Sequence, residues 1–429
     1  MAPIALMTFP AARAPGVMNP LASPPAPDRG EEAAHSAIRL LTQQECPVRS
    51  PKKLAIATTI VALAIALSAC TTGDETEPAA TGDAGASLSA EAQAALDSAF
   101  EGIGGGLDDL AAVTPEEGLN FYVMSCGESN ATCAAPAAAM KDAAETAGWN
   151  ATIVDGKLSP EGFATAIRQA VAGGADVLVP VGISCSAAAA AFGEAKDAGV
   201  TIVGGGGLDD CDPKVWDSER LWLADPPVPT PFHGIGKLQA DYTFGKTNGD
   251  PKTLVINLTS NPWGQLVTDA YTSELEALGG GEVVTVVDVA DTESADGSYI
   301  QKVTSALLAN PEINSLVVPT DAYLVNGLAA AIDQAGLADK VITVGGFGSE
   351  AALDMIRAGQ PGITATVGQA QTWEAWGSVD TAIRVLAGEQ PAFIGQSLQA
   401  VDADNNLPDS GPYDGSIDWK STFLESWGK

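Results

Sequence analysis

The stretch VITVGGFGSEAALDMIRAGQPGITATVGQ, residues 341–369, holds one complete unit of the pattern that decides the fold. A short apolar run at 341–348 predicts a buried strand, and the amphipathic segment at 350–359 predicts a helix. The apolar run at 363–369 predicts the next strand. Strands that alternate with helices of this length indicate βαβ units on a parallel sheet, which helices cover on both faces.

The same alternation runs through the chain in two series. In the first series the expected strands, each followed by an alanine-rich helical segment or a glycine-rich loop, are LNFYVMS (119–125), ATIVDG (151–156), DVLVPVG (176–182) and VTIVGGGG (200–207). In the second series, strands are expected at TLVINLTS (253–260), EVVTVVDVA (282–290) and NSLVVPT (314–320), ahead of the stretch quoted above. The last long helix of this series should end at Leu386.

Two such series predict an α/β protein with two doubly wound parallel-sheet lobes joined by a multi-strand hinge. The segment LWLADPPVPTP (221–231) lies between the series. Its Pro-rich part, 226–231, is expected to be the first crossing between the lobes, because proline stiffens the chain and continues neither a helix nor a strand. Ahead of both series, LSAEAQAALDSAFEGI (88–103) predicts a helix with Ser89 as its N-cap.

The segment KKLAIATTIVALAIALSAC (52–70) indicates where the protein works. Its apolar run, Leu54–Leu67, is 14 residues long, whereas a membrane-spanning helix needs roughly 20. Basic residues before the run and small residues after it are the parts of a secretory signal; the alternative is a buried core helix. The small, polar residues from 71 to about 88 are typical of a flexible tether. Because signals of this kind begin near the N-terminus, translation is expected to start near Val48.

The charge balance excludes one class of partner. The chain has 21 Lys and Arg against 54 Asp and Glu, a formal net charge of −33. A field of this sign repels phosphate backbones, so a nucleic-acid partner is not expected. With only two histidines and no CxxC pair in the sequence, no metal site and no cofactor are expected either.

The cysteines indicate an oxidising compartment. Of six cysteines, Cys46 lies upstream of the signal and Cys70 ends it, which leaves Cys126, Cys133, Cys185 and Cys211. An even number in an exported chain indicates disulfides, and four cysteines allow three connectivities. Of these we favour Cys126–Cys133 with Cys185–Cys211, the pairs nearest in sequence.

The order and spacing of four segments resemble the type I periplasmic-binding-protein family, in its sugar-importer branch. These segments are residues 143–184, 194–205, 310–336 and 341–369. The resemblance covers about residues 117 to 400. It implies a hinged receptor, expected to be a monomer, that closes on a small-molecule ligand and delivers it to an ABC permease. Leu67-Ser68-Ala69-Cys70 also resembles a lipobox, which implies cleavage before Cys70 and a lipid on its sulfur. The mature protein would then be lipid-anchored on the extracytoplasmic face of the cell membrane.

The resulting division of the chain has four parts. Residues 1–69 are expected to form an upstream stretch and a lipoprotein signal peptide, and residues 70–116 a flexible tether and a short helix. The N-terminal lobe is expected to contain residues 117–228 plus about 370–396. The C-terminal lobe is expected to contain residues 229–369 plus about 397–429.

Ligands of open α/β sheets bind beyond the carboxyl ends of the strands, where loops meet helix N-termini. The loops in these positions supply the candidate ligand-binding residues: Ser125, Glu128, Asn130, Ser184, Asp209, Asp210, Trp263, Asp321, Gln369 and Trp373. The resemblance implies that amides and carboxylates bind ligand hydroxyls while aromatic rings stack on the ligand. Alternatives stay open, since Glu128 and the Asp209–Asp210 pair also fit a solvated loop and the tryptophans also fit core packing.

Two departures from the sugar-receptor pattern bear on the ligand. Sugar receptors of this type commonly have GFD where this chain has Gly346-Phe347-Gly348, and they often have an arginine where NPWGQLVTDAY (261–271) has none. A larger or more apolar ligand than a simple pentose or hexose is therefore favoured.

Two other function classes remain as alternatives. A ligand-sensing receptor for a membrane signalling partner has the same sequence features as a transport receptor. An exported hydrolase is less consistent with the chain, because no GxSxG motif, cleft-loop histidine or metal cluster supplies a nucleophile and base. We therefore expect no catalytic residue and no enzyme activity.

Overall fold

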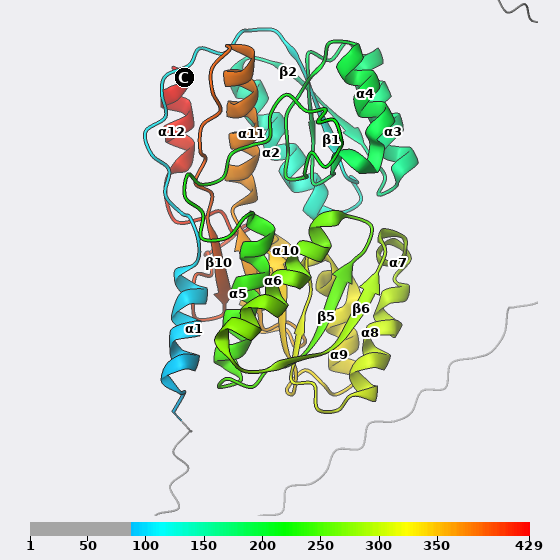
Figure 1. Ribbon diagram of the computed structural model, residues 1–429, viewed down its shortest axis with the longest axis vertical. Coiled ribbons are helices and arrows are strands. Elements are labelled where there is room, and N and C mark those ends of the chain that lie inside the picture. Colours follow the sequence, from blue (N-terminus) through cyan, green and yellow to red (C-terminus); the bar gives the residue numbers. More distant parts are fainter. Residues whose placement is uncertain (1–86) are drawn as a thin grey trace, which may run out of the picture. The chain divides into compact units, whose positions relative to one another are not determined.

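The computed structural model describes residues 87–429 (Figure 1). The predictions made for the upstream stretch, the signal segment, Cys70 and the first part of the tether lie outside these residues. Among the helices that are described, none is both long enough and apolar enough to cross a bilayer.

The first lobe is built on a sheet of four parallel strands in the order β2-β1-β3-β4. The strands are β1 (Asn120–Ser125), β2 (Asn150–Asp155), β3 (Val177–Pro180) and β4 (Thr201–Ile202). The helices that follow them are α2 (Ala131–Ala147), α3 (Pro160–Ala172), the 3₁₀ turn η1 (Cys185–Ala188) and α4 (Ala189–Asp197). Side chains of one strand alternate between two cores: Phe121 and Val123 of β1 pack with α2, whereas Met124 packs with α3 and α4. This alternation explains why the strands are apolar throughout.

The second lobe is built on six strands in the order β10-β9-β8-β7-β5-β6. They are β5 (Lys252–Leu258), β6 (Glu282–Val289), β7 (Ser315–Val317), β8 (Ile342–Phe347), β9 (Ala365–Gln369) and β10 (Leu398–Asp402). Its helical elements are α1 (Ala90–Glu101), α5 (Pro231–Lys246), α6 (Pro262–Leu278), α7 (Asp291–Asp296), α8 (Ser298–Ala309), η2 (Leu324–Leu328), α9 (Ala329–Gln334) and α10 (Glu350–Arg357). Val255 packs toward α1, α5 and α6, while Leu254 and Ile256 pack toward α8 and α9.

The two lobes share one strand order. The spatial order β6-β5-β7-β8 in the second sheet repeats the order β2-β1-β3-β4 of the first sheet, and neighbouring strands in both series pair parallel. Only β10, which pairs antiparallel with β9, departs from the pattern among the strands described. The prediction of two doubly wound, mostly parallel lobes is therefore confirmed.

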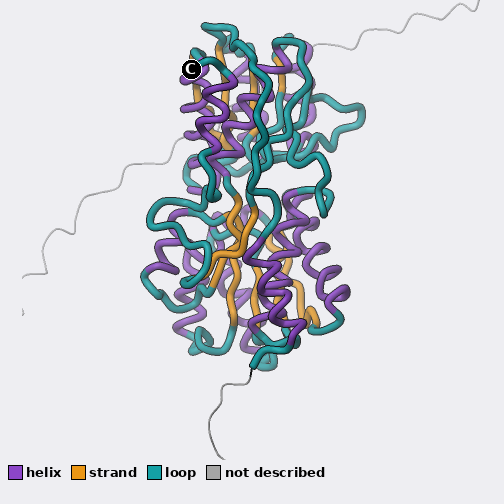
Figure 2. The backbone as a smooth tube through the Cα atoms, turned by 90° about the vertical axis from the view of Figure 1, so that its left-hand side faces the viewer, coloured by secondary structure: helices purple, strands orange, loops and turns teal. Residues whose placement is uncertain are grey.

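The first crossing between the lobes differs from the prediction. Helix α1, with Ser89 as its N-cap, packs against α5 and β10 of the second lobe. The backbone of Ile103 then pairs with that of Leu398 before the chain enters the first lobe. The Pro-rich segment 226–231 is consequently a later crossing and not the first. Figure 2 shows several loop segments that run between the two groups of helices and strands.

The C-terminal segment also differs from the prediction, which placed about 397–429 in one lobe. Strand β10 belongs to the second lobe, but α12 (Trp419–Ser426) packs on α11 (Gln371–Leu386), which contacts α2 of the first lobe (Figure 1). The ring of Trp427 stacks on that of Trp376 at 5.3 Å between centroids. The Trp427 Nε1–H also donates to the buried carboxylate of Asp380 at 2.9 Å. Aromatic burial of this kind holds the C-terminus on the first lobe.

Two disulfides join the expected partners, Cys126 with Cys133 and Cys185 with Cys211, so the favoured connectivity is confirmed. Cys126 directly follows β1, and Cys185 lies in the turn that follows β3. Both bonds therefore fix loops at the carboxyl edge of the first sheet.

Removing the two disulfides should lower the free energy of unfolding by unequal amounts. The Cys185–Cys211 bond spans 26 residues and the Cys126–Cys133 bond spans 7. In the chain-entropy account the longer loop restricts the unfolded chain more, which gives about 3.5 kcal/mol against about 2.5 kcal/mol. Urea unfolding of the paired variants C185S/C211S and C126S/C133S measures the difference. A C126S/C133S protein that is the less stable of the two would contradict the entropic account.

Candidate functional site

A cavity of about 110 Å³ lies between the loops at the carboxyl edges of the two sheets. Five aromatic side chains line it: Phe163, Phe232, Trp263, Tyr323 and Phe347. Nine polar side chains share the lining: Asn130, Thr132, Asn261, Asp291, Ser294, Thr320, Gln369, Gln371 and Glu374. The wall thus combines apolar ring faces with hydrogen-bonding groups, as small-molecule sites do.

The position of the cavity follows from the strand order. In the first sheet, β2 lies on one side of β1 and β3 on the other, so the strand order reverses between β1 and β3. In the second sheet, β6 and β7 flank β5 in the same way, so the order reverses between β5 and β7. The loops that leave these four strands supply Asn130, Gly182, Asn261 and Thr320 to the cavity wall. Reversal points of this kind are where open α/β sheets leave a crevice for a ligand. Here two such crevices share one cavity.

One wall of the cavity is aromatic. Trp263, in the first turn of α6, stacks on Phe232 at 5.3 Å between ring centroids and meets Phe347 edge-on at 5.6 Å. The backbone of Phe347 has a φ of 83°, a left-handed conformation that strains a bulky residue and persists only where the surroundings enforce it. The buried Trp263 Nε1–H has no hydrogen-bond partner among the described residues.

Two lining residues, Gln369 and Glu374, belong to a buried charged network. Glu374, in the first turn of α11, forms an ion pair with Arg220, and the Gln369 side-chain amide donates to the same carboxylate. The Arg220 and Glu374 side chains are only 7% and 8% exposed. Within the described part of the chain, the buried Gln369 Oε1 and Arg220 Nε atoms have no partner. A hydroxyl of a ligand could donate to the free Gln369 oxygen.

Asn261 connects the two lobes across the cavity. It occupies the N-cap position of α6, but its side chain makes no capping hydrogen bond. Its Nδ2 donates to the Gly182 carbonyl at 3.2 Å, and its Oδ1 accepts from the Ser184 hydroxyl at 3.3 Å. Because Gly182 and Ser184 follow β3 of the first lobe, these two bonds hold the lobes together beside the cavity.

Three of the ten predicted ligand-binding residues line the cavity, namely Asn130, Trp263 and Gln369. Asn130 also caps α2, since its Oδ1 accepts from the Thr132 N–H at 3.0 Å and from the Thr132 hydroxyl at 2.8 Å. Its role as a ligand contact, like those of Trp263 and Gln369, stays a prediction.

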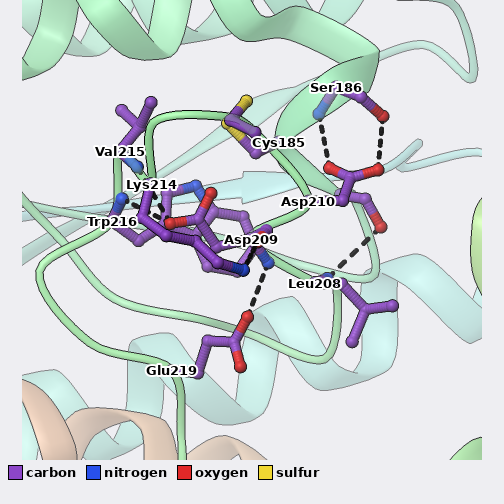
Figure 3. Close-up of a disulfide and its surroundings, with 11 residues drawn as sticks. Cys185, Ser186, Leu208, Asp209, Asp210, Lys214, Val215, Trp216 and Glu219 are labelled. Atoms are coloured by element: carbon purple, nitrogen blue, oxygen red, sulfur yellow. Dashed lines mark hydrogen bonds between the residues drawn. A yellow bond between two sulfur atoms is a disulfide. The ribbon is translucent and has the colours of Figure 1, made fainter.

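Asp209 and Asp210 lie away from the cavity and serve the loop around the Cys185–Cys211 disulfide (Figure 3). Asp209 Oδ2 accepts from the backbone N–H groups of Val215 and Trp216 at 2.9 and 3.0 Å. Asp210 accepts from the Ser186 N–H at 2.7 Å and from its hydroxyl at 2.6 Å. The loop itself engages the Asp210 carboxylate and the Oδ2 atom of Asp209, and neither residue lines the cavity, so the structure does not bring them to the candidate site.

The other predicted residues also lie outside the cavity lining. Asp321 is fully buried and accepts hydrogen bonds from the Thr366 hydroxyl and the Ser349 N–H, each at 2.7 Å. Trp373 is fully buried and stacks on Trp419 at 6.2 Å, so it is a core residue and not a wall of the cleft.

Three further predicted residues belong to the first lobe. Ser125 is buried at the end of β1, Glu128 is exposed on the following loop, and Ser184 makes the inter-lobe bond to Asn261. None of them belongs to the described lining of the cavity.

The missing acid of the GFD pattern has a structural reason. Gly348 has a φ of 68°, and a Cβ at this position would lie 2.8 Å from both the Gly368 Cα and the Tyr413 Cβ. The Tyr413 N–H donates to the Gly348 carbonyl at 2.9 Å. The C-terminal segment thus takes the space that a side chain at residue 348 would need.

Several lining residues were not among the predicted ones. Asn261 and Glu374 adjoin the predicted Trp263 and Trp373, so a wider reading of the same loops would have included them. Phe347 lies in the GFG loop that the sequence had singled out. Phe232 follows the Pro-rich crossing, and nothing in the local sequence indicates that this crossing reaches the cavity.

The fold and the cavity define a two-lobed binding protein. A family model described as a periplasmic binding protein domain matches residues 121–390, so the chain belongs to this family. The family consists of extracytoplasmic solute-binding proteins, not enzymes, in agreement with the prediction. No match was found among curated protein sequences.

Solved structures show the same fold. The glucose-galactose binding protein GanP from Geobacillus stearothermophilus is 16% identical, with a TM-score of 0.56, over 68% of this chain and 100% of its own. A periplasmic ribose ABC transporter protein from Conexibacter woesei is 20% identical, with a TM-score of 0.55, over 68% and 94%. A solute binding protein from Bacillus halodurans with bound myo-inositol is 17% identical, with a TM-score of 0.54, over 68% and 96%.

Replacing Asn261 by alanine should open the ligand-free protein. The change removes two inter-lobe hydrogen bonds of about 1 kcal/mol each, which shifts the equilibrium toward open forms by roughly 30-fold. Small-angle X-ray scattering should show a larger radius of gyration for N261A. Gln93→Ala is the control, because Gln93 is an exposed residue that bonds Asp97 within α1. Scattering curves of N261A and wild type that superimpose would contradict the inter-lobe role.

The buried Asp321 should make stability depend on pH. Burial raises the pKa of its carboxyl from 3.8 to about 6. Between these values the folded protein binds more protons than the unfolded chain, so the free energy of unfolding falls as pH rises, by up to about 3 kcal/mol. Urea unfolding at about pH 4 and about pH 7 should show this loss in wild type relative to Asp321→Asn. Asparagine can still accept from the Ser349 N–H and donate to the Thr366 hydroxyl. Equal pH slopes of the two proteins would contradict the assignment.

Proposed function

We propose that the chain is a solute receptor that captures a neutral, hydroxylated ring compound between its lobes and delivers it to an ABC permease. The observation that carries this proposal is the cavity itself. It lies where the strand order of both sheets reverses, and its lining combines aromatic rings with amide and carboxylate side chains.

The charges at the cavity favour a neutral ligand. Of the described residues that line it, the charged ones are Asp291 and Glu374, and Glu374 is already paired with Arg220. Burial raises the pKa of Asp291, which disfavours its charged form. No lysine or arginine belongs to the described lining to neutralise an anionic ligand. Ring hydroxyls could pair with Asn130, Gln369 and Asp291, while an apolar ring face could stack on Trp263.

Structural relatives support a sugar-like ligand. The solved structures with this fold include a glucose-galactose binding protein, a ribose transporter protein and a protein with bound myo-inositol. Glucose, galactose, ribose and myo-inositol are all neutral, hydroxylated rings of similar size.

A thermal-shift screen over monosaccharides, polyols, nucleosides and aromatic solutes tests the proposal, because a ligand that binds only the folded state raises the melting temperature. We expect the largest shifts from neutral sugars or polyols. Stabilisation by none of the hydroxylated compounds would contradict the proposal.

Trp263→Ala should weaken binding of the best solute by up to about tenfold, since a stacked aromatic contact contributes about 0.5–1.5 kcal/mol. Isothermal titration calorimetry measures the change. Trp263→Phe should retain most of the affinity because the ring is kept, and Leu308→Ala is the control on an exposed residue of α8. A folded W263A protein with wild-type affinity would remove Trp263 from the site.

Membrane attachment through Cys70 is part of the same proposal. The lipobox resemblance of residues 67–70 supports it, and a receptor that feeds a permease gains by being held at the membrane. Cys70→Ser should move the protein from the membrane fraction to the soluble fraction after cell lysis. Equal membrane retention of C70S and wild type would refute the lipid anchor and leave the ligand proposal intact.

A further inference from the structure

We infer that the ligand is a glycoside with two linked ring units, one in the cavity and the second in a hollow behind it. This inference rests on the proposed function and specifies its ligand. The hollow measures about 230 Å³ and is formed mainly by the crossing segments between the lobes. We call it the rear hollow; its lining includes Arg220, Leu221, Leu223, Pro226 and Phe393.

The cavity and the rear hollow are neighbours. Gly206, Phe232, Gln369 and Glu374 line both of them. Gly206 has a φ of 98°, and a Cβ there would lie 3.1 Å from Glu374 Oε1. Because glycine has no side chain, the backbone at this position can come close to Glu374 at the boundary between the two compartments.

Unpartnered polar atoms lie at this boundary. Within the described residues, Gln369 Oε1 and Arg220 Nε have no hydrogen-bond partner, although Gln369 is 3% exposed and the Arg220 side chain 7%. Buried acceptors and donors are rarely left unpaired in the functional state of a protein. A ligand hydroxyl can donate to the glutamine oxygen, and a ring or glycosidic oxygen can accept from the arginine.

The rear hollow suits a second ring more than a charged group. Leu221, Leu223 and Pro226 give it apolar walls, and Arg220, its buried cation, is already paired with Glu374. Phe393 at its edge is 47% exposed, unusually high for a large aromatic side chain. A sugar or an aromatic ring could cover such a surface.

Calorimetric titration of the full-length protein with two groups of compounds tests the inference. The single-ring group is D-glucose, D-galactose and D-ribose. The two-ring group is cellobiose, lactose and phenyl β-D-glucoside, in which the first two carry a second sugar and the third an aromatic ring. At least one two-ring compound should bind 10-fold or more tightly than the monosaccharide it contains. Tighter binding by a disaccharide would identify the second ring as a sugar, and tighter binding by phenyl β-D-glucoside would identify it as an aromatic ring.

Leu223→Trp should fill the rear hollow and abolish this gain while monosaccharide affinity stays within about twofold of wild type. Pro226→Trp is a second filling variant in case L223W does not fold. Leu308→Trp, on an exposed residue of α8, is the matched control and should change neither affinity.

Three outcomes would overturn the inference. Monosaccharides that bind as tightly as the two-ring compounds, or a gain that survives in both filling variants, would overturn the two-ring ligand and leave the proposed function standing. Failure of all six compounds to bind would overturn the two-ring inference, and a thermal-shift screen in which no hydroxylated compound stabilises the protein would overturn the proposed function as well.

Discussion

Parallel pairing of short strands buried on both faces is the constraint on which the rest of this structure depends. Parallel strands need a helix for each return, so all their carboxyl ends reach the same edge of the sheet. In this chain two such edges contribute loops to one cavity, and both do so at the point where the strand order reverses. The position of the cavity is therefore a consequence of the topology, and the individual loops determine the chemistry of its wall.

The segments between the lobes do more than connect them. Arg220 from one crossing and Glu374 from α11 form a buried ion pair beside the cavity, and breaking such a pair by removing one partner is costly because the other charge stays buried. The C-terminal segment crosses once more to bury α12 against α11 and leaves Tyr413 beside Gly348. The crossing segments thus contribute residues to the wall of the cavity, among them Phe232 and Gln369.

Much of the fold could be predicted from the sequence because it follows from local patterns. Apolar runs separated by amphipathic segments predicted the strands and helices of both lobes, and nearness in sequence favoured, among three possible connectivities, the disulfide pairs that the structure contains. The course of the crossings could not be predicted in the same way. Whether α1 and α12 pack on one lobe or the other depends on distant partners such as Leu398 and Trp376.

The candidate site was predictable only in part, for a related reason. Loops that follow the strands do line the cavity, but the sequence does not show which side chains satisfy one another. Asp209, Asp210 and Asp321 are engaged by hydrogen-bond donors within the protein. Phe232, by contrast, reaches the cavity only through the path of a crossing segment.

Nuclear magnetic resonance of the tryptophan indole N–H groups tests most directly whether a solute binds in this cavity. Trp263 lines it, whereas Trp373 and Trp427 are buried in the aromatic cluster at α11 and α12. Addition of the solute that stabilises the protein most should shift the Trp263 signal strongly and saturably and leave those of Trp373 and Trp427 nearly unchanged. Saturable binding that leaves the Trp263 signal in place would contradict a ligand site between the two lobes.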